Sequence, residues 1–318
     1  MAIEIRGGGL AGCALGWRLW ERGIPFFMTG EARQGASWVS AGLVNPIAGR
    51  SLNLTSDNRT AIQEAKAFFH QVEERVGRRI WHECPVLRFF ANEAERQKFE
   101  RRKEAFGDWL EEVLDESGYP GMGDAGAALI AGGGWLDVRA YLQASWAFFA
   151  QQNQAPGAGE SRLVIHCGGS RDLTTGVLAT LESRPAKGEI LTVEVPGWGE
   201  SRILNRGGWV VPLGNDRFRV GSTYSWDHLD EEPTEEGRSE LLTLLRQFTS
   251  LPCSIVEHVA AVRPIVRRSE PVWGRLGEDG DTYFFNGLGS KGCTFGPRAA
   301  GDLVDQLEKD KIFPLKSS

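Results

Sequence analysis

Alternating apolar and charged positions open the chain and predict a β-strand. Ile3 and Ile5 are apolar while their neighbours Glu4 and Arg6 are charged, which is the period of two of a strand with one buried face. A helix is expected over 13–22, and residues 24–28 form a second apolar stretch. This order of strand, helix and strand predicts the start of a Rossmann-like sheet.

The rest of the chain alternates between helical and extended patterns. Residues 56–77 carry apolar positions at helical spacing, and residues 92–116 are rich enough in Glu, Arg and Lys to predict a solvated helix. Further helices are expected at 136–150, 234–248 and 294–307, and strands at 79–82, 86–90, 127–131, 163–167, 185–195, 208–213, 216–220 and 255–262. The predicted fold class is α/β (mixed α+β), a Rossmann-like part interleaved with an antiparallel sheet.

Composition narrows the class of protein. The chain has 318 residues, of which 41% are hydrophobic and 25% charged, as in a globular protein with a large core. Its net charge of -6 argues against a nucleic-acid partner, and the basic run 101–103 lies among Glu residues. No apolar stretch approaches the roughly 20 residues of a membrane span, so none is expected.

The cysteines and histidines give no sign of a disulfide framework or a metal site. Five cysteines are scattered without a CxxC pair, which is typical of a reducing compartment, and we expect a cytoplasmic protein. His82, Glu83 and Cys84 are consecutive, and neighbouring side chains on a strand point to opposite faces. One metal ion could not easily collect all three, so no metal is expected.

The first turn has the spacing of a phosphate-binding loop. Gly7, Gly9 and Gly12 fit G-x-G-x-x-G, in which the first glycine allows a tight turn, the second a close approach of backbone to a pyrophosphate and the third close packing of helix on strand. The free N–H groups of the next helix would stabilise an anion there. In such folds an acid near the end of the second strand holds the ribose. Here either Glu31, just after Gly30, reaches back to the ribose or the site has lost this anchor.

Two further loops carry a resemblance to a known family. Residues 35–43 read G-A-S-x-x-x-A-G-L, and residues 283–297 run from an aromatic strand through a glycine loop into a helix. Together with the first turn they resemble the D-amino-acid oxidase and glycine oxidase family of flavoproteins. The resemblance implies FAD as cofactor and the oxidation of a small amine or amino acid by hydride transfer to the flavin.

The resemblance also implies a set of site residues. Arg263, in Val-Arg-Pro, matches the arginine that holds the substrate carboxylate, and Trp209, Tyr224 and Lys291 match positions around the substrate. Ordinary roles remain open: Arg263 could pair with a structural acid, Trp209 and Tyr224 could be core, and Lys291 could point into water. The implied cofactor-binding residues are Gly7, Gly9, Leu10, Ala11, Gly12, Glu31, Ser37, Ala41, Gly42, Gly168, Gly289, Ser290 and Gly292.

The expected domains alternate along the chain. Residues 1–50, 132–183 and 255–318 would form the FAD-binding domain, and residues 51–131 and 184–254 the substrate domain. The polar segment 151–160 stands where the family has an adenine-side strand and a meander of strands, so these features are expected to be missing.

The expected absence of the adenine-side strand and meander leaves other functions open. The main alternative is a nucleotide-fold protein that has weakened or lost flavin binding and serves as a binding or interaction module. A nicotinamide-dependent dehydrogenase is a third reading, although the closing glycine loop has no evident use there. The substrate, the electron acceptor and the oligomeric state stay open.

Overall fold

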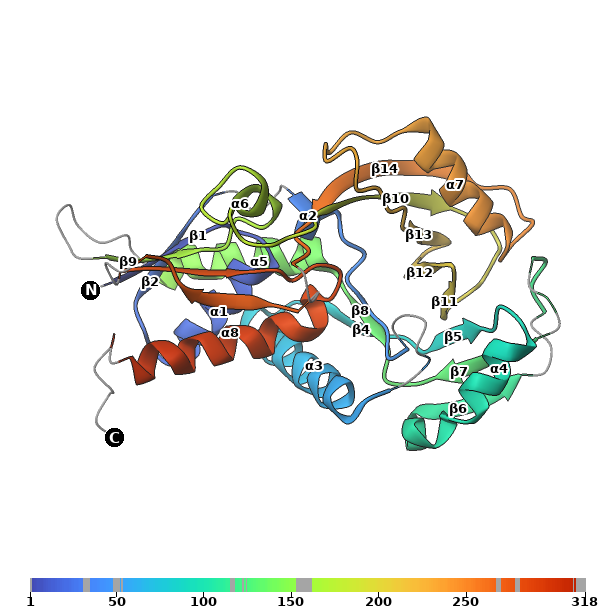
Figure 1. Ribbon diagram of the computed structural model, residues 1–318. Helices are drawn as coiled ribbons and strands as arrows, with labels where there is room; N and C mark the ends of the chain where they lie inside the picture. Colours follow the sequence, from blue (N-terminus) through green and yellow to red (C-terminus); the bar gives the residue numbers. More distant parts are fainter. Residues whose placement is uncertain are drawn as a thin grey trace.

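A five-stranded sheet forms one end of the molecule (Figure 1). The computed structural model describes residues 2–30, 35–47, 52, 54–114, 118–121, 123, 125–152, 162–266, 270–277, 281–310 and 312. In the order of the sheet the strands are β15 (Val272–Arg275), β16 (Thr282–Asn286), β9 (Arg162–His166), β1 (Ala2–Arg6) and β2 (Phe26–Thr29). All neighbours are parallel except β15 and β16. The carboxyl ends of β1, β9 and β16 therefore meet at one edge.

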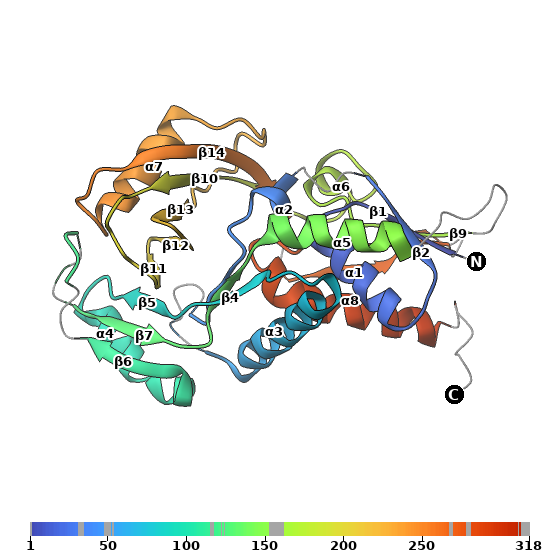
Figure 2. The same ribbon diagram turned by 180° about the vertical axis from the view of Figure 1, so that it is seen from behind.

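Four helices pack with this sheet into the largest core. They are α1 (Leu10–Glu21), α3 (Ser56–Val76), α5 (Val138–Gln152) and α8 (Gly292–Lys309). Figure 2 shows α5 alongside α1, where the Trp17 indole donates to Ser145 Oγ at 2.9 Å and stacks on Phe148 with ring centroids 4.7 Å apart. Apolar residues of α3 belong to the same core, although the sequence assigned α3 to the substrate part.

An eight-stranded sheet forms the other end and curves around an open concave side (Figure 1). Its strands, in order, are β14 (Ser254–Arg263), β10 (Ala186–Glu194), β13 (Arg217–Gly221), β12 (Gly208–Gly214), β11 (Ile203–Arg206), β5 (Val86–Phe89), β7 (Ala127–Ile130) and β6 (Leu110–Leu114). All neighbours are antiparallel except β11 and β5. Leu241 and Leu245 of α7 (Glu235–Arg246) pack in one cluster with Leu191 and Val193 of β10. Ile190 lines the concave side, and neighbouring residues of a strand point to opposite faces, so α7 covers the other face of the sheet.

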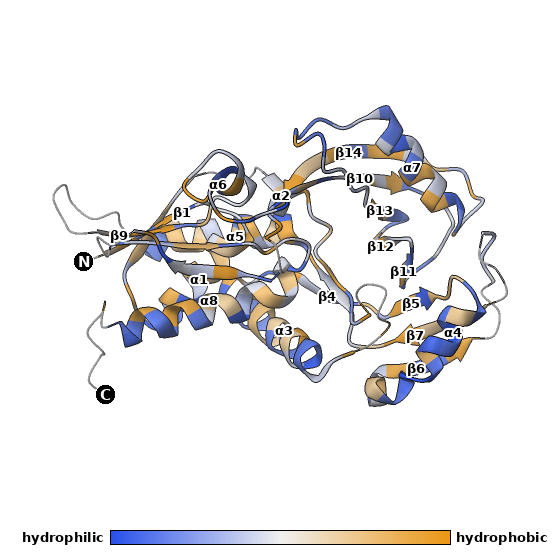
Figure 3. Cartoon of the chain, in the orientation of Figure 1, coloured by the Kyte–Doolittle hydropathy of each residue, from blue (hydrophilic) through white to orange (hydrophobic). Residues whose placement is uncertain are grey.

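A small three-stranded sheet lies between the two larger ones. Its order is β3 (Leu43–Val44), β8 (Gly134–Leu136) and β4 (Trp81–Glu83). The short elements that complete the described chain are α2 (Gly35–Val39), α4 (Glu93–Glu100), the 3-10 helix η1 (Lys103–Trp109) and α6 (Ser170–Thr174). Figure 3 shows hydrophilic residues gathered on α4 and α7, at the outer end of the curved sheet.

The predicted mixed α/β class is confirmed, whereas several elements differ from the prediction. Residues 92–116 do not form one helix, because Gly107 has φ 50° and non-helical backbone, and Leu110–Leu114 then pairs with β7 as an edge strand. Residues 35–39 form a short helix instead of the expected loop. Residues 151 and 152 end α5, and 153–160 lie outside the described residues.

Within the described ranges, β2 is the outermost strand on its side of the five-stranded sheet. Among these residues no helix combines the length and the apolar character that crossing a membrane requires.

Candidate functional site

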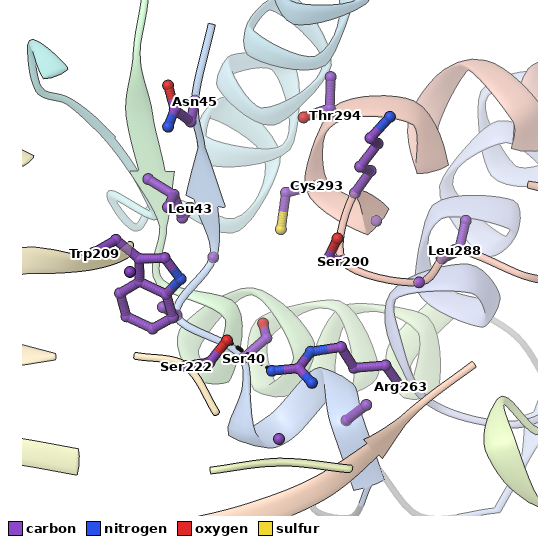
Figure 4. A pocket seen from close by; sticks show the side chains of 18 of the residues that line it. Ser40, Leu43, Asn45, Trp209, Ser222, Arg263, Leu288, Ser290, Cys293 and Thr294 are labelled. Atoms are coloured by element: carbon purple, nitrogen blue, oxygen red, sulfur yellow. Dashed lines mark hydrogen bonds between the residues drawn. The ribbon is translucent and has the colours of Figure 1, made fainter. Parts of the chain in front are cut away.

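A cavity of about 960 Å³ lies between the concave side of the large sheet and the turns after β1 and β16 (Figure 4). Its wall draws on segments far apart in the sequence. They include the start of α1, residues 36–45, the segment 88–98, strands β10, β11, β12 and β14, the loop 286–291 and the first turn of α8. Most of the residues that the sequence assigned to cofactor and substrate therefore meet in one place. The predicted residues in the wall are Gly9, Leu10, Ala11, Ser37, Ala41, Gly42, Trp209, Tyr224, Arg263, Gly289, Ser290, Lys291 and Gly292.

The turn after β1 is built so tightly that backbone alone fits. Gly7 has φ 126°, and a Cβ there would lie 2.4 Å from the carbonyl oxygen of Cys167. A Cβ on Gly12 would lie 1.9 Å from the carbonyl oxygen of Gly7. Both glycines lie beneath the cavity without lining it, and they let strand and helix approach.

The N-terminus of α1 faces the cavity without a side-chain cap. Gly9 is the N-cap residue, and the first turn holds no acidic residue. The N–H of Leu10 donates to Ser37 Oγ at 3.0 Å, so the hydroxyl of α2 lies where the helix can hold an anionic group. This end of the cavity is thus positively polarised without a basic side chain.

Gly168 and Glu31 were predicted to bind the nucleotide part of the cofactor. The N–H of Gly168 is already occupied, since it donates to Asp172 Oδ2 at 2.7 Å; Gly168 is absent from the cavity wall, whereas its neighbour Gly169 is part of it. Glu31 lies outside the described residues. Gly30 at the end of β2 has φ 103°, and a Cβ there would lie 3.5 Å from Gly7.

The segment that follows α2 is fixed against the small sheet. A Cβ on Gly42 would lie 1.9 Å from the carbonyl oxygen of Leu136, and the N–H of Leu136 donates to the carbonyl oxygen of Gly42 at 3.0 Å. The glycine therefore permits a close backbone contact that holds Ala41 and Gly42 in the cavity wall.

The closing glycine loop presents a second helix N-terminus to the same space. Lys291 is the N-cap residue of α8, without a side-chain cap, and its amine lies 5.6 Å from the centre of the Phe295 ring. Cys293 also lines the cavity (Figure 4), and burial raises the pKa of its thiol to about 12. The thiol is therefore protonated at neutral pH, and the helix terminus supplies the positive field.

Arg263 extends from β14 into the cavity and is held by uncharged groups. Its guanidinium donates to the carbonyl oxygens of Lys187 and Thr223 at 3.1 and 3.2 Å and to Ser222 Oγ at 2.7 Å (Figure 4). It lies 4.1 Å from the centre of the Tyr224 ring. No carboxylate of the described residues forms an ion pair with it, and burial lowers its pKa. Among the described residues, then, no structural acid is paired with Arg263.

Trp209 and Tyr224 flank this arginine in different ways. Trp209 is half-buried on β12 and faces the cavity, with its ring lying over Gly221, where a Cβ would meet the indole at 2.4 Å. Tyr224 is 46% exposed and stacks on Arg263 and beside Trp226, so it is not a core residue. Both side chains line the wall next to Arg263.

Sequence reasoning missed several polar residues of the wall. Ser40, Asn45, Ser222, Thr294, Arg88 and Asn205 all line the cavity. Ser222 comes just after the strand expected over 216–220, and its contact with Arg263 depends on how β13 and β14 flank β10. Among the described residues no group of three or more His, Cys, Asp and Glu is placed to hold a metal ion.

Comparison with known proteins assigns the family. A sequence model described as FAD dependent oxidoreductase, abbreviated DAO, matches residues 3–306. The chain belongs to this FAD-dependent oxidoreductase family. FAD is the cofactor of the family, and the predicted resemblance is confirmed.

Solved structures of similar fold include two glycine oxidases. That of Bacillus cereus has a TM-score of 0.79 at 18% identity and covers 97% of this chain and 95% of its own. The glycine oxidase of Geobacillus kaustophilus has a TM-score of 0.75 at 20% identity, covering 96% and 94%. The iminodiacetate oxidase of Chelativorans sp. has a TM-score of 0.77 at 17% identity, covering 99% and 97%. These likenesses establish the fold.

Two curated relatives carry a different description. Both are called tRNA 5-methylaminomethyl-2-thiouridine biosynthesis bifunctional protein MnmC. The one from Marinobacter nauticus is 23% identical over 96% of this chain and 55% of its own length. The one from Idiomarina loihiensis is 28% identical over 42% of this chain and 23% of its own length. The chain thus spans about half or less of the relatives it matches.

Proposed function

We propose that this protein is a flavoenzyme that oxidises a small amine or amino acid at the carbon next to nitrogen. The observation that carries the proposal is the guanidinium of Arg263, which has no carboxylate partner among the described residues and lies in the same cavity as the N-termini of α1 and α8. A substrate carboxylate would supply the missing partner through charge-assisted hydrogen bonds.

The residues present fit FAD. The pyrophosphate would lie at the N-terminus of α1, above the turn in which Gly7 and Gly12 leave no room for a side chain. Ala41, Gly42 and the loop around Gly289 would form the walls along the ring. In the proposed division of the chain, 1–50, 132–183 and 255–318 hold the cofactor, and 51–131 and 184–254 the substrate, although α3 within 51–131 packs in the core of the cofactor part.

The protein's own side chains would bind the substrate and orient it. FAD, when bound, would supply a two-electron acceptor for the hydride of the carbon next to nitrogen, and the imine left on the substrate would be hydrolysed by water. Arg263 would fix the substrate carboxylate, and Trp209 would close one wall and limit how the amine can turn. The N-terminus of α8, with Lys291 beside it, would stabilise negative charge that develops next to it.

The test begins with the purified protein. Denaturation should release a compound with the absorption spectrum of FAD, and anaerobic addition of a substrate amino acid should bleach the visible bands of the native protein. Protein that contains no flavin and binds none on reconstitution would instead support the alternative of a nucleotide-fold binding module.

A second candidate substrate is an aminomethyl group on a tRNA uridine. It is favoured by the curated relative that aligns with 96% of this chain. The exposed rings of Tyr224 and Trp226, with Arg184 4.9 Å from the latter, are surfaces on which a base can stack. The net charge of -6 opposes an RNA partner. Flavin bleaching by tRNA that carries an aminomethyl uridine, and not by free amino acids, would decide for this candidate.

A further inference from the structure

The register of the large sheet sets five residues in one row across its concave side. Ile190 pairs with Gly221, Gly221 with Trp209, Trp209 with Asn205, and Asn205 with Arg88. Directly paired residues present their side chains to the same face of a sheet. All of the row except Gly221 line the cavity, so the cavity continues past Trp209, away from Arg263.

Gly221 decides which way the Trp209 ring lies. A Cβ at Gly221 would meet the indole at 2.4 Å, which means that the ring covers β13 and leans away from β11. Asn205 and Arg88 on the other side of Trp209 therefore remain open to the cavity. Neighbouring strands are about 4.8 Å apart, so these two side chains begin about 5 and 10 Å beyond Trp209.

Asn205 and Arg88 form a fixed polar group. Arg88 donates from Nη1 to Asn205 Oδ1 and from Nη2 to Glu95 Oε1, both at 2.8 Å, and Asn205 Nδ2 donates to the carbonyl oxygen of Gly208 at 2.9 Å. The side chains of Arg88 and Glu95 are 13% and 18% exposed. Such contacts hold both donors in one orientation before any ligand arrives.

Arg88 has more N–H groups than its contacts with Asn205 and Glu95 use. A guanidinium carries five N–H groups, of which these contacts use two. The buried Nε of Arg88 has no hydrogen-bond partner among the described residues. Glu95 lines the cavity as well, and its carboxylate is already paired with Arg88. A bound group there is stabilised when it brings acceptor oxygens.

We propose that Asn205 and Arg88 form a distal subsite that binds a carbonyl-type oxygen on the nitrogen substituent of the substrate. The substrate class is then an N-substituted amino acid, with its carboxylate at Arg263, its C–N bond beside Trp209 and a polar substituent that reaches β11 and β5. The inference rests on the proposed function, because the position of the carboxylate at Arg263 belongs to it.

The experiment compares two ligands of nearly equal shape, N-(carbamoylethyl)glycine and N-isopentylglycine. Dissociation constants are measured by calorimetry on the flavin-loaded protein without oxygen, and kcat/KM is measured with oxygen. The amide should bind about ten- to a hundredfold more tightly than the alkyl compound, as expected for a hydrogen bond to a charged donor. Equal affinity would overturn the proposal.

Three variants locate the effect. Asn205→Leu, and separately Arg88→Met combined with Glu95→Gln so that no charge is left unpaired, should bring the affinity ratio close to one. Arg217→Met is the matched control, since Arg217 lies on the same sheet, pairs with Glu194 at 3.2 Å and is absent from the cavity wall. It should keep the full ratio, and a ratio retained in the Asn205 and Arg88 variants would overturn the assignment.

The two readouts separate this inference from the proposed function. A preference for the amide in binding, without reduction of the flavin by any amino acid, would leave the subsite standing and remove the oxidase. Oxidation of both compounds with equal kcat/KM and equal affinity would leave the oxidase standing and remove the subsite.

Discussion

Nη2 of Arg139 lies 2.9 and 3.0 Å from the two carboxylate oxygens of Glu257. This ion pair joins α5 to β14, and Arg139 Nε also donates to the carbonyl oxygen of Trp38 in α2 at 3.1 Å. Arg219 donates to the carbonyl oxygen of Ser40, and burial together with the nearby charge of Arg139 lowers its pKa. Two arginines and one glutamate thus hold the segment that lines the cavity against the large sheet.

We expect Glu257→Gln to loosen this segment, because Arg139 then loses its ion-pair partner and Arg219 loses a nearby compensating charge. The pair is partly buried, so the free energy of unfolding should fall by about 1–3 kcal/mol. Urea denaturation of Glu257→Gln, Arg139→Met and the double variant measures their coupling. The same cycle for the exposed pair Arg217 and Glu194 should give less than about 0.5 kcal/mol. Equal coupling in the two cycles would remove the special role of Glu257.

Replacement of Arg263 by alanine tests the carboxylate site. We expect a loss of about 2–4 kcal/mol in transition-state binding for a carboxylate-bearing substrate, which is about thirty- to a thousandfold in kcat/KM. An amine without a carboxylate serves as the internal control, since it has no group for Arg263 to hold and should lose much less. A similar loss for both substrates would indicate that Arg263 supports the wall together with Ser222 and Tyr224 and does not bind the substrate.

Features whose chemistry is local in the sequence were predictable. The turn at Gly7, Gly9 and Gly12 and the helix after it follow from spacing, and the approach of Gly12 to Gly7 lies within this one turn. The contact of Gly7 with Cys167, by contrast, is long-range and became visible only in the structure. The capped helix α3 was equally clear, since Thr55 accepts from the N–H of Asn58 and Gly77 ends the helix at φ 62°. Local rules of this kind need no knowledge of tertiary contacts.

Features that depend on the register of paired strands could not be predicted from the sequence. The contact between Arg88 and Asn205 joins residues 117 positions apart through the parallel pair of β5 and β11, which are four residues each. Strands this short carry almost no periodicity. The strand Leu110–Leu114 was mispredicted as helix for another reason. It is an edge strand with exposed Glu111 and Glu112, and in the sequence such charged residues resemble the solvated face of a helix.

Substitution of Gly12 tests the close packing of α1 on the first turn, and Gly296 provides a matched control. Gly12→Ala places a Cβ 1.9 Å from the carbonyl oxygen of Gly7, so either the helix or the turn must move. We expect at least about 2 kcal/mol lower stability, with less flavin retained after gel filtration. Gly296→Ala, also within a helix, meets its nearest atom at 3.8 Å and should be neutral or raise stability by up to about 1 kcal/mol. Comparable melting temperatures for the two variants would contradict the tight approach at Gly12.

The pH dependence of stability should contain a contribution from Glu200. Burial tends to raise the pKa of this carboxyl, but hydrogen bonds from Arg202, at 2.9 and 3.0 Å, and from Tyr119 outweigh burial, so the pKa lies below its ordinary value. A lowered folded-state pKa stabilises the fold above the unfolded pKa of about 4.3, and this stabilisation is lost as the pH falls through the folded value.

Glu200→Gln should therefore cost about 2 kcal/mol at pH 7 and progressively less as the pH falls below about 4, and the difference should vanish once the pH is below the lowered pKa of the folded wild-type carboxyl. Urea unfolding at a series of pH values measures the difference between the two proteins. Glu194→Gln, at a more exposed carboxyl, should stay within about 0.5 kcal/mol of the wild type at pH 7. A constant difference between Glu200→Gln and the wild type across the acidic range would mean that packing, and not the charge of Glu200, stabilises this end of the sheet.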